Sequence, residues 1–195
     1  MKTIIFRYEI LIMMSLFFIS CSRPSSEIPE SSLDSEKVGI DVWGPLSSID
    51  DYLSYSHTGE QWIAVNDVKL KIDGLVEYPL EMNYNQVLNH KIYSNIATLK
   101  CIEGWSVRMR WEGVRVEDLI KEAGIKENAT LLIFHSFDGY KTYLFLHDVL
   151  TYNMILAYKV NGVLLPLKLG FPFQLVAEGQ DGLSWVKGVA EIEVQ

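Results

Sequence analysis

The sequence predicts an α+β fold with mixed or antiparallel β-sheets and few short helices. Three observations support this prediction. Most apolar segments of the 195 residues are short and show the alternation or the apolar runs of β-strands. Segments with helical spacing are few and short. They do not alternate regularly with the strands, as a parallel α/β sheet would require.

The predicted strands are apolar segments bounded by turn residues. They cover residues 68–73, 97–102, 107–111, 131–134, 142–146, 155–160, 163–165, 173–177 and 189–194. Within 107–111, Val107, Met109 and Trp111 are expected on one face and the intervening arginines on the other. The consecutive apolar residues 131–134 predict a strand buried on both faces. The Asn-Gly pair at 161–162 predicts a hairpin turn.

Short helices are expected in three places. Val116, Leu119, Ile120 and Ala123 follow helical spacing, and Gly124 ends that segment. The other two are expected through residues 87–88, with Asn83 or Asn85 as the N-cap, and over residues 147–153.

The N-terminal segment has the features of an export signal. Two basic residues precede the apolar residues 10–19, a stretch too short to span a bilayer. Ser20 followed by Cys21 resembles a bacterial lipobox, so we predict that residues 1–20 are a lipoprotein signal peptide. Cys21 would then carry the lipid and anchor an exported protein on the periplasmic or cell-surface side of a bacterial membrane. The alternative is an ordinary secretory signal with an incidental cysteine.

The next segment is predicted to be a flexible tether. Residues 21–37 include six serines and two prolines and few apolar residues, so they cannot form a core. A single domain is expected over residues 38–195, where the apolar content is sufficient for a substantial core. The whole chain has 49% hydrophobic residues and a net charge of −8. This acidic balance argues against a nucleic-acid partner.

Cys101 is the only cysteine beyond Cys21. It cannot form a disulfide within the predicted domain, so three roles remain open for it: a small buried hydrophobic residue, a nucleophile or a metal ligand. Arg108 and Arg110 would favour a thiolate electrostatically. No sequence pattern marks a histidine as a base for Cys101, and no cluster has the spacing of a zinc site. The four histidines are His57, His90, His135 and His147.

Residues 68–195 resemble the molybdopterin-binding domain of the sulfite oxidase family. This family includes sulfite oxidases, plant nitrate reductases and the catalytic subunit of a bacterial periplasmic methionine sulfoxide reductase. The similarity lies in an ordered series of short blocks around Cys101-Ile102-Glu103-Gly104-Trp105-Ser106. The other blocks are residues 72–76, 79–80, 111–114, 136 with 138–140, 156–158, 161–162, 165–166, 170–172, 187 and 191–194.

The resemblance implies a sulfite-oxidase-like fold that binds the molybdenum cofactor, molybdopterin. Cys101 takes the position of the family's thiolate ligand to molybdenum, and Tyr140 that of a tyrosine beside the metal. The pterin-binding positions correspond to Gly170, Gln174, Ser184 and Lys187. The implied enzyme is an oxidoreductase that transfers an oxygen atom to or from a small oxyanion or sulfoxide. It would take its electrons from a separate protein partner.

The chain departs from the family at four positions near the pterin. Leu169 replaces a histidine, Gln174 an arginine, Ser184 a basic residue and Gly188 a tryptophan. Residues 61–66 are all that is expected to replace the longer N-terminal portion of larger members. Two main hypotheses follow: a membrane-tethered molybdenum oxidoreductase, and a cofactor-free binding or scaffold module with the same fold. A cysteine hydrolase or a thiol redox protein is a third.

Overall fold

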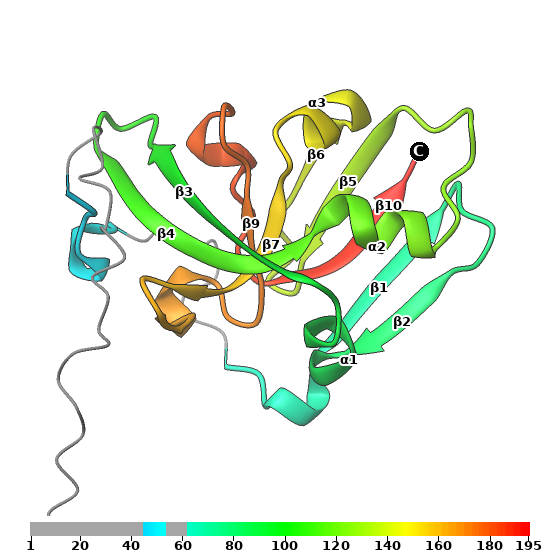
Figure 1. The fold of residues 1–195 in the computed structure, drawn as a ribbon, viewed down its shortest axis with the longest axis horizontal. Helices are drawn as coiled ribbons and strands as arrows, with labels where there is room; N and C mark the ends of the chain where they lie inside the picture. The colour runs from blue at the N-terminus through cyan, green and yellow to red at the C-terminus, as the bar shows by residue number, and fades with distance from the viewer. Residues whose placement is uncertain (1–44, 54–61) are drawn as a thin grey trace, which may run out of the picture. The chain divides into compact units, whose positions relative to one another are not determined.

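Two five-stranded sheets form the framework of residues 45–53 and 62–195, the part of the chain that the computed structural model describes (Figure 1). The first sheet contains, in spatial order, β2 (Leu80–Asn83), β1 (Lys69–Gly74), β10 (Val189–Val194), β5 (Leu131–Ser136) and β6 (Lys141–Phe145). The second contains β3 (Ile92–Lys100), β4 (Ser106–Arg115), β7 (Ile155–Val160) and β8 (Val163–Leu164), with β9 (Gln174–Val176) paired to β7. β1 and β10 are parallel and the other pairs are antiparallel. The predicted α+β fold with mixed sheets is confirmed.

Short helical segments connect these strands within the described residues. The α-helices are α1 (Tyr84–Leu88), α2 (Val116–Glu122) and α3 (Leu146–Thr151). The 3-10 segments are η1 (Ile49–Asp51), η2 (Val65–Asp67), η3 (Leu167–Leu169) and η4 (Gly182–Ser184). The Asn83 side chain accepts a bond from the Gln86 backbone, and the Gln86 side chain accepts one from the Asn83 backbone. This reciprocal capping box starts α1 where the sequence predicted a cap.

Strand patterns agree with the sequence in most places and correct it at one. Val107, Met109 and Trp111 in β4 are all buried, as expected from their alternation. The prediction that residues 131–134 are buried on both faces is wrong, because only alternate residues of β5 are buried. The outer face of β5 pairs Ile133 with Tyr143 of β6, and that tyrosine is 63% exposed. The apolar residues on the outer face of β5 therefore pair with β6 residues on a solvent-facing side of the sheet, and no further layer of the described residues buries them.

Buried residues from both sheets belong to one hydrophobic core. Trp111 of β4 meets the Trp185 ring edge-on, with 5.7 Å between ring centroids. Tyr84 of α1 stacks on Phe173 at 5.4 Å. The core therefore ties β4 to the segment after η4, which carries Trp185 and Lys187 toward the site described below.

Several sequence predictions fall outside the described residues. The signal peptide over 1–20, the lipidated Cys21, the tether over 21–37 and the start of the predicted domain at 38–44 are among them. His57 and Gln61 also lie outside. No helix in the described part of the chain is long and apolar enough to cross a membrane.

Candidate active site

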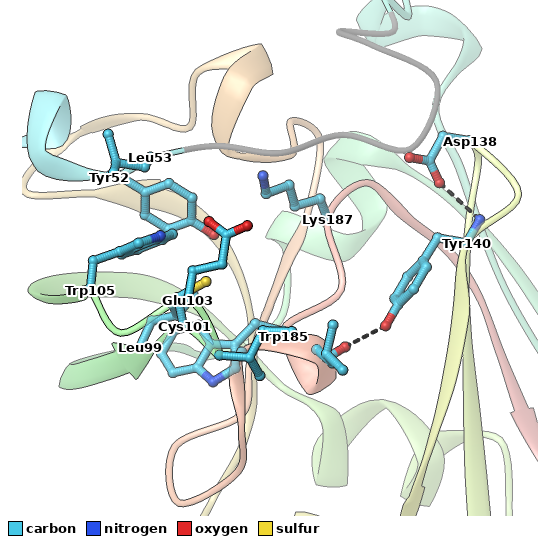
Figure 2. Close-up of a pocket in the computed structure, with 13 residues that line it drawn as sticks. Tyr52, Leu53, Leu99, Cys101, Glu103, Trp105, Asp138, Tyr140, Trp185 and Lys187 are labelled. Atoms are coloured by element: carbon cyan, nitrogen blue, oxygen red, sulfur yellow. Dashed lines mark hydrogen bonds between the residues drawn. The ribbon is translucent and has the colours of Figure 1, made fainter.

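A cavity of about 350 Å³ lies where four separate segments of the chain meet. Its walls come from the β3–β4 turn, the β5–β6 turn, η4 with the residues after it, and the segment 45–53 (Figure 2). Three predicted site residues line it: Cys101, Tyr140 and Lys187. They lie far apart in the sequence, and the fold brings them together.

Cys101 opens the turn between β3 and β4. The sequence placed it inside a strand, but β3 ends at Lys100. The Cys101 N–H donates to the Trp105 carbonyl at 2.9 Å, and the Gly104 N–H donates to the Cys101 carbonyl at 3.0 Å. Gly104 has φ of +92°, a conformation that glycine adopts without strain. This tight turn leaves the thiol half-buried at the cavity wall.

η4 packs directly on the Cys101 turn. A Cβ atom at Gly182 would lie 3.0 Å from the Lys100 oxygen and 3.2 Å from the Cys101 Cα, so a glycine permits this close approach. Asp181 caps η4 by accepting from the backbone of Leu183 at 3.1 Å and of Ser184 at 3.2 Å. The Ser184 hydroxyl also donates to Asp181, at 3.3 Å. Ser184 is therefore engaged in the cap and is not among the residues that line the cavity.

Tyr140 reaches the cavity from the β5–β6 turn. Its N–H donates to the Asp138 carboxylate at 2.9 Å, and its hydroxyl donates to the Leu183 carbonyl at 2.7 Å. Burial and, secondarily, the charge of Asp181 raise the pKa of Tyr140 above its usual value, although a bond to Thr142 opposes the change. The phenol thus joins the β5–β6 turn to η4 and stays protonated.

Gly170 and Lys187 form a close backbone contact. Gly170 has φ of +92°, and a Cβ atom there would lie 2.6 Å from the Lys187 Cβ. The Gly188 N–H donates to the Gly170 carbonyl at 3.0 Å. Gly170 does not line the cavity; it allows the η3 loop to pack beneath Lys187. The Lys187 ammonium lies 5.2 Å from the centroid of the Tyr52 ring.

Gln174 lies in the core rather than in the cavity wall. Its side chain is fully buried, and its amide nitrogen donates to the Trp185 carbonyl at 3.1 Å and to the Leu175 carbonyl at 3.2 Å. Its side-chain oxygen has no hydrogen-bond partner within residues 45–53 and 62–195. Leu169 is also fully buried. A Cβ atom at Gly188 would lie 2.1 Å from the Phe137 ring, so that ring occupies the space beside Gly188.

Sequence reasoning missed the contribution of segment 45–53. Tyr52 and Leu53 from this segment line the cavity, and Tyr52 is only 5% exposed. Burial, reinforced by the proximity of Cys101, raises the pKa of Tyr52, so its phenol remains neutral. The sequence contains the Ser48–Asp51 capping box of this segment. It gives no sign that the segment contacts residues far along the chain, such as Arg108.

No histidine is among the described residues that line the cavity. His90 bonds Glu122 at 2.7 Å, His135 bonds Glu193 at 3.0 Å, and His147 faces Thr151. The described lining of the cavity therefore contains no imidazole beside Cys101. The described residues also contain no group of three or more His, Cys, Asp or Glu side chains arranged to hold a metal ion.

Comparison with known proteins decides the family. Residues 57–195 match the family described as the oxidoreductase molybdopterin binding domain. The chain belongs to this family. The molybdopterin-binding family match covers the turn with Cys101, Tyr140 and Lys187, and it begins after the segment 45–53. The family resemblance inferred from the ordered blocks is thereby confirmed.

Three relatives illustrate the similarity. The chain is 34% identical over 121 residues to the uncharacterized oxidoreductase YuiH of Bacillus subtilis, covering 60% of this chain and 61% of that protein. It is 27% identical to the protein-methionine-sulfoxide reductase catalytic subunit MsrP of Gluconobacter oxydans, covering 64% and 46%. The crystal structure of the sulfane dehydrogenase SoxCD from Paracoccus pantotrophus matches with a TM-score of 0.69 and 25% identity, covering 72% of this chain and 41% of that one. The chain thus spans roughly half the length of these relatives.

The chemical groups that line the cavity are of the types that could hold a molybdenum cofactor of this family. Cys101 offers a soft sulfur ligand, and Lys187 offers a cation for an anionic group. The cavity volume is within the range of small-molecule sites.

Proposed function

We propose that the protein is a molybdenum-cofactor-dependent oxidoreductase in which Cys101 is the protein ligand of the metal. The observation that carries the proposal is the convergence of Cys101, Tyr140 and Lys187 on one cavity. The family match supports the cofactor, and the chemistry of a half-buried single thiol supports the ligand. When bound, the cofactor supplies two-electron oxygen-atom transfer.

The chain's own residues bind and orient the reactants. Cys101 would hold the metal, and the short turn closed by Gly104 fixes the direction of the thiol. Lys187, whose ammonium lies over the Tyr52 ring, would bind an anionic group. Tyr140 holds η4 in place through the Leu183 carbonyl. Trp185, which is 3% exposed, excludes water from the wall between them.

The mouth of the cavity favours a neutral sulfoxide over an oxyanion. Glu103 and Asp138 both line the cavity, whereas Lys187 is the one basic side chain among the described lining residues. An anionic substrate would meet a net negative rim. Ile102 and Leu183 line the same mouth and are 68% and 53% exposed, which suits an apolar substituent on the substrate sulfur.

The proposed reaction reduces the sulfoxide to a sulfide. The sulfur–oxygen bond breaks, and the oxygen leaves as water after two protons and two electrons are added. We infer that a separate electron-transfer protein supplies the electrons, since the active site contains no second redox group among its described residues. Similarity to MsrP, whose name states a reductase of methionine sulfoxide in proteins, supports this direction.

We also propose that Cys21 tethers the mature protein to a bacterial membrane. The Ser20-Cys21 pair after an apolar segment supports lipid attachment, and the serine-rich residues that follow would give the domain reach from the surface. A Cys21→Ser variant is expected to move from the membrane fraction to the soluble exported fraction. Wild-type protein that is soluble without detergent would contradict the tether.

The decisive experiment measures metal and pterin in purified protein. Full-length protein produced in a host that makes the cofactor should contain close to one molybdenum per chain, and Cys101→Ser should lose most of it without unfolding. Exposed Ser106→Ala in β4 is a nearby control and should keep wild-type metal content. Less than about a tenth of a molybdenum in well-folded wild type would contradict the proposal.

The cofactor-free module is the second candidate, and the burial of Gln174 and Leu169 favours it. These positions depart from the family and are engaged in the core rather than in the cavity. If this candidate is correct, wild type and Cys101→Ser will be equally stable and equally free of molybdenum. Metal present in the wild type and absent from Cys101→Ser excludes it.

A further inference from the structure

Segment 45–53 closes one side of the active-site cavity although it precedes the family match, which starts at residue 57. The Ser47 N–H donates to the Arg108 carbonyl at 2.7 Å, and the Arg108 N–H donates back to the Ser47 hydroxyl at 3.0 Å. The Asn161 side chain donates to the Ser47 carbonyl at 3.0 Å, and Lys168 pairs with Asp50 at 3.1 Å. The segment is therefore fastened to β4, to the β7–β8 turn and to η3.

These bonds position Tyr52 in the cavity wall. Its ring meets Trp105 edge-on with 5.5 Å between centroids, while the Lys187 ammonium lies over it. Figure 2 shows the ring entering the cavity beside Trp105, with its hydroxyl end toward Glu103 and the Cys101 sulfur. The ring is thus held on two sides, and its hydroxyl faces the space where a substrate would lie.

The two tyrosines of the cavity differ in what their hydroxyl groups do. The Tyr140 hydroxyl donates to the Leu183 carbonyl, so its proton is already engaged. Among residues 45–53 and 62–195, the structure gives the Tyr52 hydroxyl no hydrogen-bond partner. A phenol that is held in place but unpaired suits hydrogen bonding to a bound oxygen, because no existing bond must break first.

We propose that Tyr52 is a catalytic residue whose hydroxyl donates a hydrogen bond to the oxygen of the sulfoxide bound beside Cys101. This inference rests on the proposed function and adds a residue outside the family-matched region. The bond draws electron density toward the oxygen and weakens the sulfur–oxygen bond that breaks. The Tyr140 hydroxyl then has a structural task, which is to hold η4.

Steady-state kinetics on the cofactor-loaded full chain test the role of the hydroxyl. Methionine sulfoxide is the substrate and reduced benzyl viologen the electron donor. Tyr52→Phe keeps the ring and its contacts, so molybdenum content should be unchanged while kcat/KM falls about ten- to hundredfold, mainly through kcat. Tyr143→Phe makes the same change on an exposed strand residue and should stay within about twofold of wild type. Tyr52→Phe with wild-type kcat and KM would overturn the proposal.

Alkylation of Cys101 in cofactor-free protein supplies a readout that does not depend on catalysis. N-ethylmaleimide modification is followed on the Cys101 peptide by mass spectrometry. Tyr52→Ala opens the cavity wall shared with Cys101 and should raise the alkylation rate about tenfold, whereas Tyr52→Phe should leave it unchanged. An unchanged rate in Tyr52→Ala would show that Tyr52 does not shield Cys101. This result would overturn the inference, whether or not the protein binds molybdenum in the separate metal analysis. A raised rate in protein that never binds molybdenum would contradict the proposed function alone.

Discussion

The thiol end of the cavity and its lysine end differ in the polar groups that they offer a ligand. At the thiol end, Cys101 brings a sulfur to the cavity wall. Tyr52, whose ring also contacts the Lys187 ammonium, brings a hydroxyl that has no hydrogen-bond partner among the described residues. At the lysine end, Gln174 is buried in the core and Ser184 is held in a helix cap. The comparison teaches that the groups suited to catalysis are present, whereas the binding of an anion depends on few side chains.

The departures at the lysine end are structurally compensated. Gln174 stands where the family resemblance expects an arginine, and its amide holds the Trp185 and Leu175 carbonyls. Gly188 stands where a tryptophan is expected, and the Phe137 ring packs into the space beside it. Both replacements keep the local packing, and only the one at Gln174 removes a positive charge. We therefore expect the loss of the arginine to act on cofactor affinity more than on the fold.

The largest effect that tests this comparison is expected from Lys187→Met. A charge-assisted hydrogen bond to an anionic group is worth about 1.5–3 kcal/mol, so its loss should lower cofactor affinity roughly ten- to hundredfold. Molybdenum and pterin retained after dialysis measure this change. Lys187→Arg should retain more cofactor than Lys187→Met because it keeps the charge.

Lys141→Met is the matched control, since Lys141 is an exposed residue of β6 that does not line the cavity. It should retain wild-type cofactor content. Equal retention by Lys187→Met and wild type would show that the lysine end does not bind the anionic group. In that case the contrast between the two ends would have to be explained by backbone amides rather than by side-chain charge.

We expect Gln174→Leu to have a moderate effect on stability. The cofactor content per folded chain should not change. The change leaves the Trp185 carbonyl without its side-chain donor in the core, which should lower the free energy of unfolding by about 1–2 kcal/mol. Urea denaturation of cofactor-free protein measures it, and Gln174→Met provides a second variant of similar length. A variant that is as stable as wild type but tenfold poorer in molybdenum would place Gln174 in the binding surface instead.

Local sequence signals predicted most of the strand and helix framework. The alternation in β1 and β4, the cap at Asn83 and the Asn-Gly turn at 161–162 are each set by residues a few positions apart. Such short-range preferences survive in the fold because packing agrees with them. The gathering of Cys101, Tyr140 and Lys187 was anticipated only through the family resemblance, since residue types alone left Cys101 as one of three possibilities.

The remaining features depend on contacts between distant segments. Tyr52 reaches the cavity because Ser47 bonds Arg108 and Asn161, and neither partner is near it in the sequence. Cys101 lies in a turn rather than in a strand because Gly104 adopts a positive φ and closes back on it. The partial exposure of Leu131 and Ile133 could not be predicted from composition, because an apolar run does not reveal which face of a strand is covered.

The smallest predicted effect lies away from both ends of the cavity, at the bond between His90 and Glu122. Burial lowers the pKa of His90, but its bonds to Glu122 and to the Val87 and Gln86 carbonyls outweigh that effect and raise the pKa above its usual value of about 6.5. A raised pKa in the folded state adds stability below the unfolded pKa, and this stability is lost as pH rises through the folded pKa. Glu122→Gln should therefore lower the free energy of unfolding at pH 5.5 by less than about 1 kcal/mol, because Glu122 is half exposed, and much less at pH 8.5. Urea denaturation at the two pH values measures the difference, with exposed Glu127→Gln as the control. If the variant's loss were instead larger at pH 8.5, the charged pair would not be the source, and the pH dependence of stability would have to be sought nearer the cavity.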